Sequence, residues 1–263
     1  MAKVSVIIPT CNRPELLARA VASVKAQTFQ DLELIIEDDG QTKRGGAATR
    51  NLGASQASGE YLAFLDDDDE WLPDKLLKQV TALKAASTDT TFCFTAVTNV
   101  YDDHEERTQV PAGVGDYLPL ALKKFNGFLT STLLIRKSSF EAVGGFDESF
   151  PSHQEPDLII RLSQQFKGLG VNEPLVKMSL SRGHEHIGSK LERRIAGREK
   201  ILTKHQDLFN RYPKVLAKHL FNLGLWYRNL RETKKARINF YRAWQNHHHP
   251  RYLVHYGRSF LGY

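Results

Sequence analysis

The sequence is poor in cysteine and contains no long hydrophobic run. Its 263 residues include two cysteines, Cys11 and Cys93, which are too few for the disulfide framework of a small secreted domain. Each lies in an apolar stretch, so we expect buried, reduced thiols. No apolar run is long enough to span a bilayer, and the first residues resemble a strand rather than a signal peptide. These absences predict a cytoplasmic protein. The length and the 41% hydrophobic content suit one large domain, or one domain with a small appendage.

Acidic residues are scarce toward the C-terminal end of the chain. Residues 1–182 contain 19 Lys and Arg against 25 Asp and Glu, whereas residues 183–263 contain 17 against 5. The basic segment is predicted to meet either an anionic membrane, as a peripheral contact at its inner face, or the acidic body itself. Nucleic acid is not an expected partner, because the segment lacks the alternation of aromatic and basic residues that forms a stacking platform.

Short β-branched apolar runs alternate with helical patterns over the first 170 residues. Such runs are typical of buried strands, and an early proline suits the first turn of each helix. The alternation predicts an α/β fold with a mostly parallel sheet and helices on both faces. We expect strands at 4–10, 32–40, 59–69, 90–101 and 128–137, and helices at 13–27, 72–86 and 155–166.

After residue 190 the strand patterns end. Residues 214–245 predict a helical hairpin with one apolar stripe on each helix, and this pattern resembles a tetratricopeptide-type helix pair. A single pair cannot bury its own apolar face, so we expect it to pack on the body. The predicted organisation is one domain over residues 1–190 and a basic helical extension over residues 191–263.

Polar clusters follow the first three predicted strands. They comprise residues 10–13, the pair Asp38 and Asp39, and the four aspartates at 66–69. Adjacent parallel strands would bring these clusters to one edge of the sheet. Because ligands of such sheets bind beyond the carboxyl ends of the strands, this edge is predicted to be a site.

The run of four aspartates has two interpretations. Adjacent carboxylates repel one another, which contributes nothing to folding. A solvated turn and a helix cap would explain Asp69, Glu70 and Asp74, which lie near the start of the helix expected from residue 72. Residues 66–68 fit this interpretation less well, because they adjoin a buried strand. Mg²⁺ or Mn²⁺ would relieve the repulsion, since both prefer carboxylate oxygens and share their coordination shell with substrate phosphates.

Three blocks of sequence, taken in order, resemble a known family. They are VSVIIPTCNRPELLARAVASVKAQTFQDLELIIEDDG at 4–40, GGAATRNLGASQASGEYLAFLDDDDEWLPDKL at 45–76 and LIRKSSFEAVGGFDESF at 134–150. Together they resemble the family 2 glycosyltransferases of the GT-A fold, over about residues 3–190. The resemblance implies an enzyme that transfers a sugar from a nucleotide-sugar donor.

The aspartate run would then be the Asp-X-Asp motif of this family. By resemblance, Asp68 ligates the metal ion that holds the donor diphosphate, and Asp66 or Asp67 contacts the ribose or the sugar. A metal ion at that place acts as a Lewis acid on a leaving group that gains negative charge.

The family resemblance also implies a nucleotide pocket. It would consist of one residue that accepts a hydrogen bond from the base and four residues around it. Asp39 matches the residue that hydrogen-bonds a uracil ring, and an ionised carboxylate is a suitable acceptor for the N3–H group. The alternative for the Asp38–Asp39 pair is a turn with Gly40. The remaining positions would line or close over the pocket: Pro9, Thr10, Arg13 and Arg50.

The acceptor hydroxyl needs a base, and by resemblance Glu155 occupies the family's catalytic position. The alternative is that Glu155, just before Pro156, only caps a helix. One base and one leaving-group metal imply single displacement with inversion, whereas a hydrolase needs a paired acid and base across the sugar. The segment SRGHEHIGS matches one in which a histidine often approaches the diphosphate or metal, and His184 and His186 are both candidates.

One departure from the family lies between residues 40 and 45. Only QTKR remains there, where family members usually have a helix and a strand. The departure motivates an alternative hypothesis, a catalytically silent sugar-nucleotide-binding or scaffold protein that uses its helical tail. A sugar-phosphate nucleotidyltransferase would need a glycine-rich loop after the first strand, and PTCNRP contains no glycine.

The main hypothesis is an inverting, Mg²⁺- or Mn²⁺-dependent transferase with a UDP-sugar donor and a glycan or lipid-linked acceptor.

Overall fold

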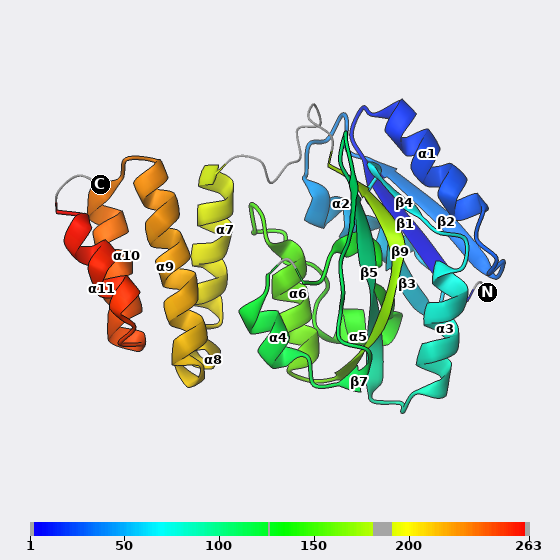
Figure 1. The fold of residues 1–263 in the computed structure, drawn as a ribbon. Coiled ribbons are helices and arrows are strands. Elements are labelled where there is room, and N and C mark those ends of the chain that lie inside the picture. Colours follow the sequence, from blue (N-terminus) through cyan, green and yellow to red (C-terminus); the bar gives the residue numbers. More distant parts are fainter. Residues whose placement is uncertain (1–2, 126, 181–190, 261–263) are drawn as a thin grey trace. The chain divides into compact units, whose positions relative to one another are not determined.

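The computed structural model describes residues 3–125, 127–180 and 191–260 (Figure 1). It divides into two compact units. The N-terminal unit comprises residues 1–149 and 154–184, and the C-terminal unit comprises residues 150–153 and 185–263. The predicted domain boundary at residue 190 lies among residues that the structure does not describe.

The N-terminal unit is built on one large sheet. Its strands are Val4–Thr10 (β1), Leu32–Asp38 (β2), Tyr61–Phe64 (β3), Asp69–Trp71 (β4), Thr90–Val100 (β5), Glu105–Arg107 (β6), Gly113–Gly115 (β7), Leu134–Arg136 (β8) and Lys167–Ser179 (β9). The strand order is β2-β1-β3-β8-β5-β9-β4, with β6 beside β5 and β7 beside β9. Along this path only β8 and β4 run against the others. The prediction of a mostly parallel sheet is confirmed.

Helices cover both faces of this sheet (Figure 1). The α-helices of this unit are Pro14–Lys25 (α1), Gly46–Gln56 (α2), Lys75–Ala85 (α3), Leu118–Lys123 (α4), Lys137–Ala142 (α5) and Gln154–Ser163 (α6), and Thr130–Thr132 (η1) is a 3₁₀-helix. All seven residues of β1 are buried, which explains why this strand is apolar along its whole length.

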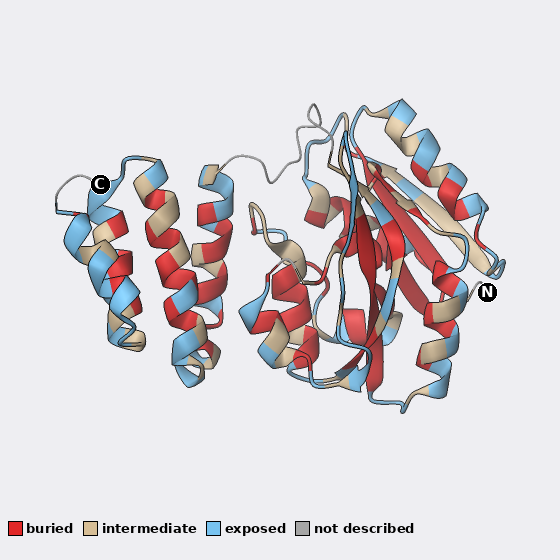
Figure 2. Ribbon diagram, viewed as in Figure 1, coloured by how far each residue is buried: buried red, intermediate tan, exposed pale blue. Residues whose placement is uncertain are grey.

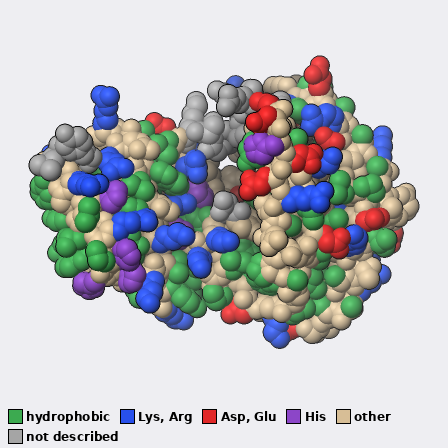
Figure 3. Space-filling model, in the orientation of Figure 1, with side chains coloured by type: hydrophobic (Ala, Val, Ile, Leu, Met, Phe, Trp, Pro, Cys, Tyr) green, Lys and Arg blue, Asp and Glu red, His purple; other side chains and the backbone are tan. Residues whose placement is uncertain are grey.

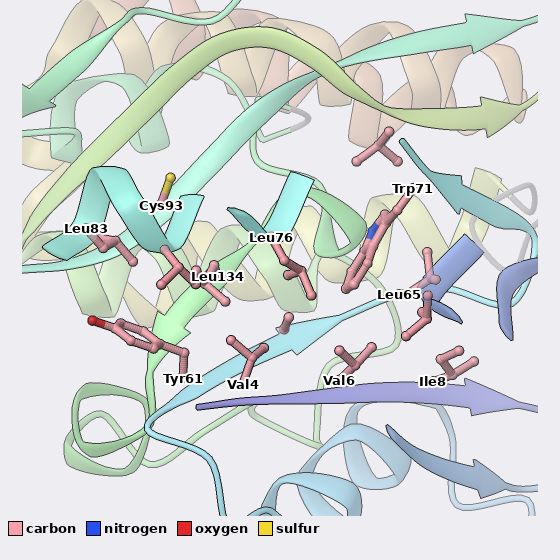
Figure 4. Packing of buried hydrophobic residues seen from close by; sticks show 14 of the residues in the cluster. Val4, Val6, Ile8, Tyr61, Leu65, Trp71, Leu76, Leu83, Cys93 and Leu134 are labelled. Carbon is pink, nitrogen blue, oxygen red and sulfur yellow. The ribbon is translucent and has the colours of Figure 1, made fainter. Parts of the chain in front are cut away.

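Alternate residues of β1 pack into two separate cores. Val4, Val6 and Ile8 belong to a cluster that includes side chains of α1 and α3 (Figure 4). Ile7 points to the opposite face, where α2 comes so close that a Cβ at Gly53 would lie 2.6 Å from the Cγ2 of Ile7. The buried residues concentrate on the central strands and the helix faces that cover them (Figure 2). These two cores hold β1 between the helices on the two faces of the sheet.

Two predicted strands are shorter than expected. The strand predicted at 59–69 ends at Phe64, and the strand predicted at 128–137 is reduced to β8 because η1 precedes it. The prediction for the cysteines is right for Cys93, which is buried in β5, and wrong for Cys11, which is exposed. Cys11 follows the last residue of β1, so the apolar run that precedes it ends before the cysteine.

The C-terminal unit is helical, as predicted. Its helices are Leu191–Lys204 (α7), Gln206–Arg211 (α8), Pro213–Asn229 (α9), Thr233–Asn246 (α10) and Pro250–Arg258 (α11). Helices α9 and α10 form the expected hairpin, and a Cβ at Gly224 would lie 2.5 Å from the ring of Phe240. The missing side chain therefore allows the two helices to pack closely. Among the described residues, no helix is long and apolar enough to cross a membrane.

The amine of Lys75 is fully buried at the start of α3. Its Nζ lies 3.9 Å from the centre of the Trp71 ring and has no hydrogen-bond partner among the described residues. Burial lowers the pKa of Lys75 to about 7. An unfolded chain keeps this proton up to about pH 10, so between these two pH values the unfolded state binds more protons than the folded state.

We expect the free energy of unfolding to rise with pH between pH 7 and 9, by up to about 1.4 kcal/mol per pH unit from Lys75 alone. Lys75→Met should remove this contribution and make the protein more stable at pH 7, because Met fills a similar volume without a desolvated amine. Urea unfolding of both proteins across this pH range measures the difference. Parallel pH profiles for the two proteins would show that Lys75 is protonated in the folded state.

Candidate active site

The ends of β1, β2 and β3 meet at one edge of the sheet, as predicted. Thr10, the last residue of β1, lies opposite Asp38, the last residue of β2. On the other side, β1 pairs in parallel with β3, and the hydroxyl of Thr10 donates a hydrogen bond of 2.7 Å to Asp67. The polar residues that follow the three strands are therefore neighbours in space.

Asp67 is the most enclosed carboxylate of the first three aspartates. Its side chain is 0% exposed, and Arg13 binds it with Nη2 2.5 Å from Oδ1 and Nε 3.1 Å from Oδ2. Burial raises the pKa of Asp67, while the Thr10 hydroxyl and the Arg13 charge oppose this rise. The contacts join the segment after β1 to the segment after β3. They leave the Asp67 carboxylate buried and bound by two side chains.

Asp66, Asp68 and Asp69 form a cluster of a different kind. One carboxylate oxygen from each lies within 4.8 Å of the other two. Asp66 forms an ion pair with Arg50, and Arg13 Nη1 lies 3.4 Å from Asp68 Oδ2. Three hard oxygen donors at this spacing fit Mg²⁺ or Mn²⁺.

The position of Asp69 corrects the helix-cap interpretation. Asp69 and Glu70 belong to β4, which pairs antiparallel with β9, and α3 begins only at Lys75, after a cap residue, Asp74, that makes no side-chain cap bond. Burial, reinforced by the charge of Asp66, raises the pKa of Asp69 well above its usual value. A cation beside this carboxylate would offset both effects, which supports its assignment to the cluster.

Arg50 links the acidic cluster to α6. The residue projects from α2, is only 7% exposed, and its Nη1 lies 3.4 Å from the side-chain oxygen of Gln154. A Cβ at Gly46 would lie 2.9 Å from the same Nη1, so the glycine leaves room for the guanidinium. Burial disfavours the charge of Arg50, but Asp66 and Glu155 outweigh it and raise the pKa overall. A permanent positive charge therefore interacts with both Asp66 and Glu155.

The short helix η1 supports both halves of the site. The Thr130 hydroxyl donates a 2.7 Å hydrogen bond to Glu155 Oε1. The Ser131 hydroxyl accepts from the backbone N–H of Asp66 at 3.1 Å and donates to Asp69 at 2.5 Å. We did not identify Thr130 and Ser131 from the sequence. The signal available was the run Thr-Ser-Thr, which interrupts an otherwise apolar strand pattern with three hydroxyls.

Asp39 is bound by the short connection that follows it. Its Oδ1 accepts hydrogen bonds from the Thr42 hydroxyl at 2.6 Å and the Arg44 N–H at 2.8 Å, and its Oδ2 accepts from the Gly45 N–H at 2.8 Å. Burial acts to raise the pKa of Asp39, but these hydrogen bonds prevail and lower it. The carboxylate is thus ionised and hydrogen-bonded by the protein. Its Oδ1 accepts two of these hydrogen bonds and its Oδ2 accepts one.

The remaining predicted site residues lie in two places. Pro9 is buried within β1, opposite Glu37 of β2 and next to Thr10. His184 and His186 lie outside the described residues. The structure therefore brings together Thr10, Arg13, Arg50, Glu155 and residues 66–68, and adds residues 69, 130 and 131.

The family model described as Glycosyltransferase like family 2 matches residues 3–188. The chain belongs to this family. The glycosyltransferase is 28% identical over 222 residues to the amylovoran biosynthesis glycosyltransferase AmsB of Erwinia amylovora, across 72% of this chain and 74% of that protein.

Solved structures show the same fold at low sequence identity. S. aureus TarS in complex with UDP-GlcNAc matches with a TM-score of 0.65 and 14% identity, over 99% of this glycosyltransferase and 92% of that chain. Mannosyltransferase PcManGT of Pyrobaculum calidifontis, in complex with GDP-Man and Mn²⁺, matches with a TM-score of 0.58 and 14% identity, over 99% and 81% of the two chains. The predicted GT-A fold is confirmed.

We expect Thr130→Val to lower kcat by about ten- to a hundredfold, because it removes one hydrogen bond to a charged group. Val matches Thr in shape, so the melting temperature should change little. Thr130→Ser keeps the hydroxyl and should restore turnover, which separates positioning of Glu155 from a packing effect. Equal turnover of the Val and Ser variants would remove Thr130 from the mechanism.

Proposed function

We propose that this protein is an inverting, metal-dependent glycosyltransferase that moves a sugar from a UDP-sugar to a hydroxyl group of a glycan or lipid-linked acceptor. The observation on which this proposal chiefly depends is the convergence of an acidic cluster, a buried arginine and Glu155 at one edge of the sheet. These are the parts that a single displacement requires: a place for the diphosphate, a fixed positive charge and a base.

Asp66, Asp68 and Asp69 are the residues that would hold Mg²⁺ or Mn²⁺. When bound, the ion would neutralise the negative charge that a departing nucleoside diphosphate gains. PcManGT, a structural neighbour, binds Mn²⁺, in keeping with this assignment. We assign Asp67 a positioning role, because its carboxylate is fully engaged by Thr10 and Arg13.

The two arginines would bind the negatively charged diphosphate of the donor directly, beside the metal ion. Arg13 and Arg50 are bonded to Asp68 and Asp66 at the cluster. A donor diphosphate beside the cluster would come within reach of both guanidinium groups, which bind phosphate oxygens in a fixed planar geometry. In this mechanism Arg50 stabilises the negative charge that builds up on the leaving group, and Glu155 accepts the proton of the acceptor hydroxyl.

Glu155 suits the role of general base because only one of its two carboxylate oxygens accepts a hydrogen bond from a described residue. Among the described residues, Thr130 alone donates a hydrogen bond to it, at Oε1. The second oxygen can then accept a proton. With one base and, in the part of the chain that the structure describes, no second carboxylate assigned as a nucleophile, the sugar would be transferred in one step with inversion.

The choice of UDP follows from Asp39 and from TarS, a structural neighbour whose complex contains UDP-GlcNAc. Asp39 Oδ2 accepts a single described hydrogen bond, and a carboxylate oxygen can accept another from the N3–H of uracil. A role in polymer biosynthesis is supported by AmsB, which is named for amylovoran biosynthesis.

The short connection that suggested a silent scaffold is folded against Asp39 and does not separate the catalytic groups. A protein without turnover would have no need for Glu155, Arg50 and Asp66 to lie together. We therefore prefer the catalytic hypothesis, and turnover of a nucleotide-sugar panel, followed by the release of nucleoside diphosphate, tests it directly.

Within that assay, Glu155→Gln should lower kcat by about 10²- to 10⁴-fold, since the amide cannot accept a proton. The amide oxygen can still accept the hydrogen bond of Thr130, so UDP affinity and melting temperature should remain close to those of the wild type. If Glu155 only capped α6, the variant would lose a little stability and keep its turnover. That result would make Asp157 the next candidate for the base.

A second prediction concerns Asp68. UDP binding, measured by calorimetry, should weaken by about ten- to a hundredfold when the metal is chelated, because a charge-assisted contact to the diphosphate is lost. Asp68→Ala should bind UDP weakly with or without metal. Asp74→Ala is the matched control, because Asp74 follows in the same acidic segment but is bonded to Thr28. Equal affinity of the wild-type protein with and without metal contradicts the prediction.

A further inference from the structure

The outer surface of α10 and α11 exposes an unusual share of large apolar side chains. Eight large hydrophobic residues are exposed among the described parts of the chain, and five of them lie between residues 238 and 260. We call the surface that they form the α10–α11 face. It consists of Ile238, Tyr241, Leu253, Val254 and Phe260.

Ring contacts connect the two helices within this face. Tyr241 of α10 lies 5.2 Å from Tyr256 of α11, measured between ring centres, and Tyr256 lies 5.2 Å from Phe260. Helix α11 already has a buried side, formed by Tyr252 and followed by the buried Ser259. The exposed apolar residues are therefore a second apolar surface, which the folding of this unit does not use.

The same face is basic and contains no acid. Residues 233–260 include six Lys and Arg and no Asp or Glu. Five of the six are exposed, namely Lys234, Lys235, Arg242, Arg251 and Arg258. The guanidinium of Arg237 stacks on Phe260, with its Cζ 3.7 Å from the ring centre. Figure 3 shows basic, histidine and hydrophobic side chains interspersed over this unit.

We propose that the α10–α11 face docks on the surface of an anionic lipid bilayer. Basic side chains bind the negatively charged headgroups. Leucine, valine and isoleucine side chains enter the boundary with the acyl chains, and tyrosine and phenylalanine suit the interface between the two regions. Nucleic acid would use the same positive charge but has no place for exposed aliphatic side chains. This inference requires neither the sugar nor the acceptor of the proposed reaction to be known.

The test is co-sedimentation of the full chain with vesicles of phosphatidylcholine, alone or mixed with phosphatidylglycerol, at low and high salt. We expect binding only to the mixed vesicles and a decline with salt, since salt screens exposed charges. The charge variant replaces three side chains by glutamine, at Lys234, Arg242 and Arg258. It should bind about a hundredfold more weakly, at about fivefold for each basic side chain near an anionic surface.

An apolar variant tests the other half of the face. Leu253→Asn with Val254→Asn keeps every charge but removes the aliphatic contact, and it should abolish the part of the binding that survives at high salt. A charge control replaces exposed lysines of the N-terminal unit by glutamine, at Lys25, Lys84 and Lys123. An apolar control replaces exposed residues of the same unit by asparagine, at Leu77 and Val114. Both controls should bind vesicles like the wild type.

Three outcomes overturn the proposal. The first is no binding of the wild type to anionic vesicles at low salt, and the second is an equal loss of binding in the control variants. The third is tighter binding of the face to single-stranded RNA than to anionic vesicles, with the same variants losing the RNA. Nucleoside diphosphate release with a soluble acceptor is measured in parallel. It should be unchanged in all four variants, so a failure here remains distinct from a failure of the proposed reaction.

Discussion

Repulsion among the four aspartates at residues 66–69 is the constraint on which the arrangement of the site in the N-terminal unit depends. Four carboxylates in sequence cannot share one environment, and the fold gives them different ones. The first has Arg50, the second is enclosed by Thr10 and Arg13, the third is near Arg13, and the last is held by a hydroxyl of η1. Three carboxylates remain close enough for a cation to complete the arrangement.

Each partner of this acidic segment comes from a different element, and the sheet determines where those elements end. Parallel pairing of β1 with β2 and β3 places the polar residues after each strand at one edge. Tight packing on both faces of β1 fixes that edge in position. The rigid sheet thus supports a site made largely of segments outside it, in keeping with the location of ligands in other α/β sheets.

The C-terminal unit must bury apolar helix faces without a sheet. Its hairpin buries one apolar stripe per helix, and Gly224 allows the close approach of α9 and α10. The last helix buries one side and exposes another. Because residues 233–260 lack acid, the exposed side combines apolar contact with a single sign of charge, a combination suited to a lipid surface.

The sequence alone determined the elements whose pattern is local. Strands β1, β2 and β5 show continuous apolar runs, and the hairpin shows helical periodicity, so these elements were predicted close to their observed positions. Through the family resemblance of short blocks, the sequence also predicted Asp68, Arg50 and Glu155 as site residues, which the structure brings to one edge of the sheet. Only the tertiary structure placed Asp69 in a strand beside the cluster and Thr130 against Glu155, contacts that join residues 62 and 25 positions apart in the chain. Such contacts depend on how β4, η1 and α6 pack together, and no local pattern of side chains encodes that packing.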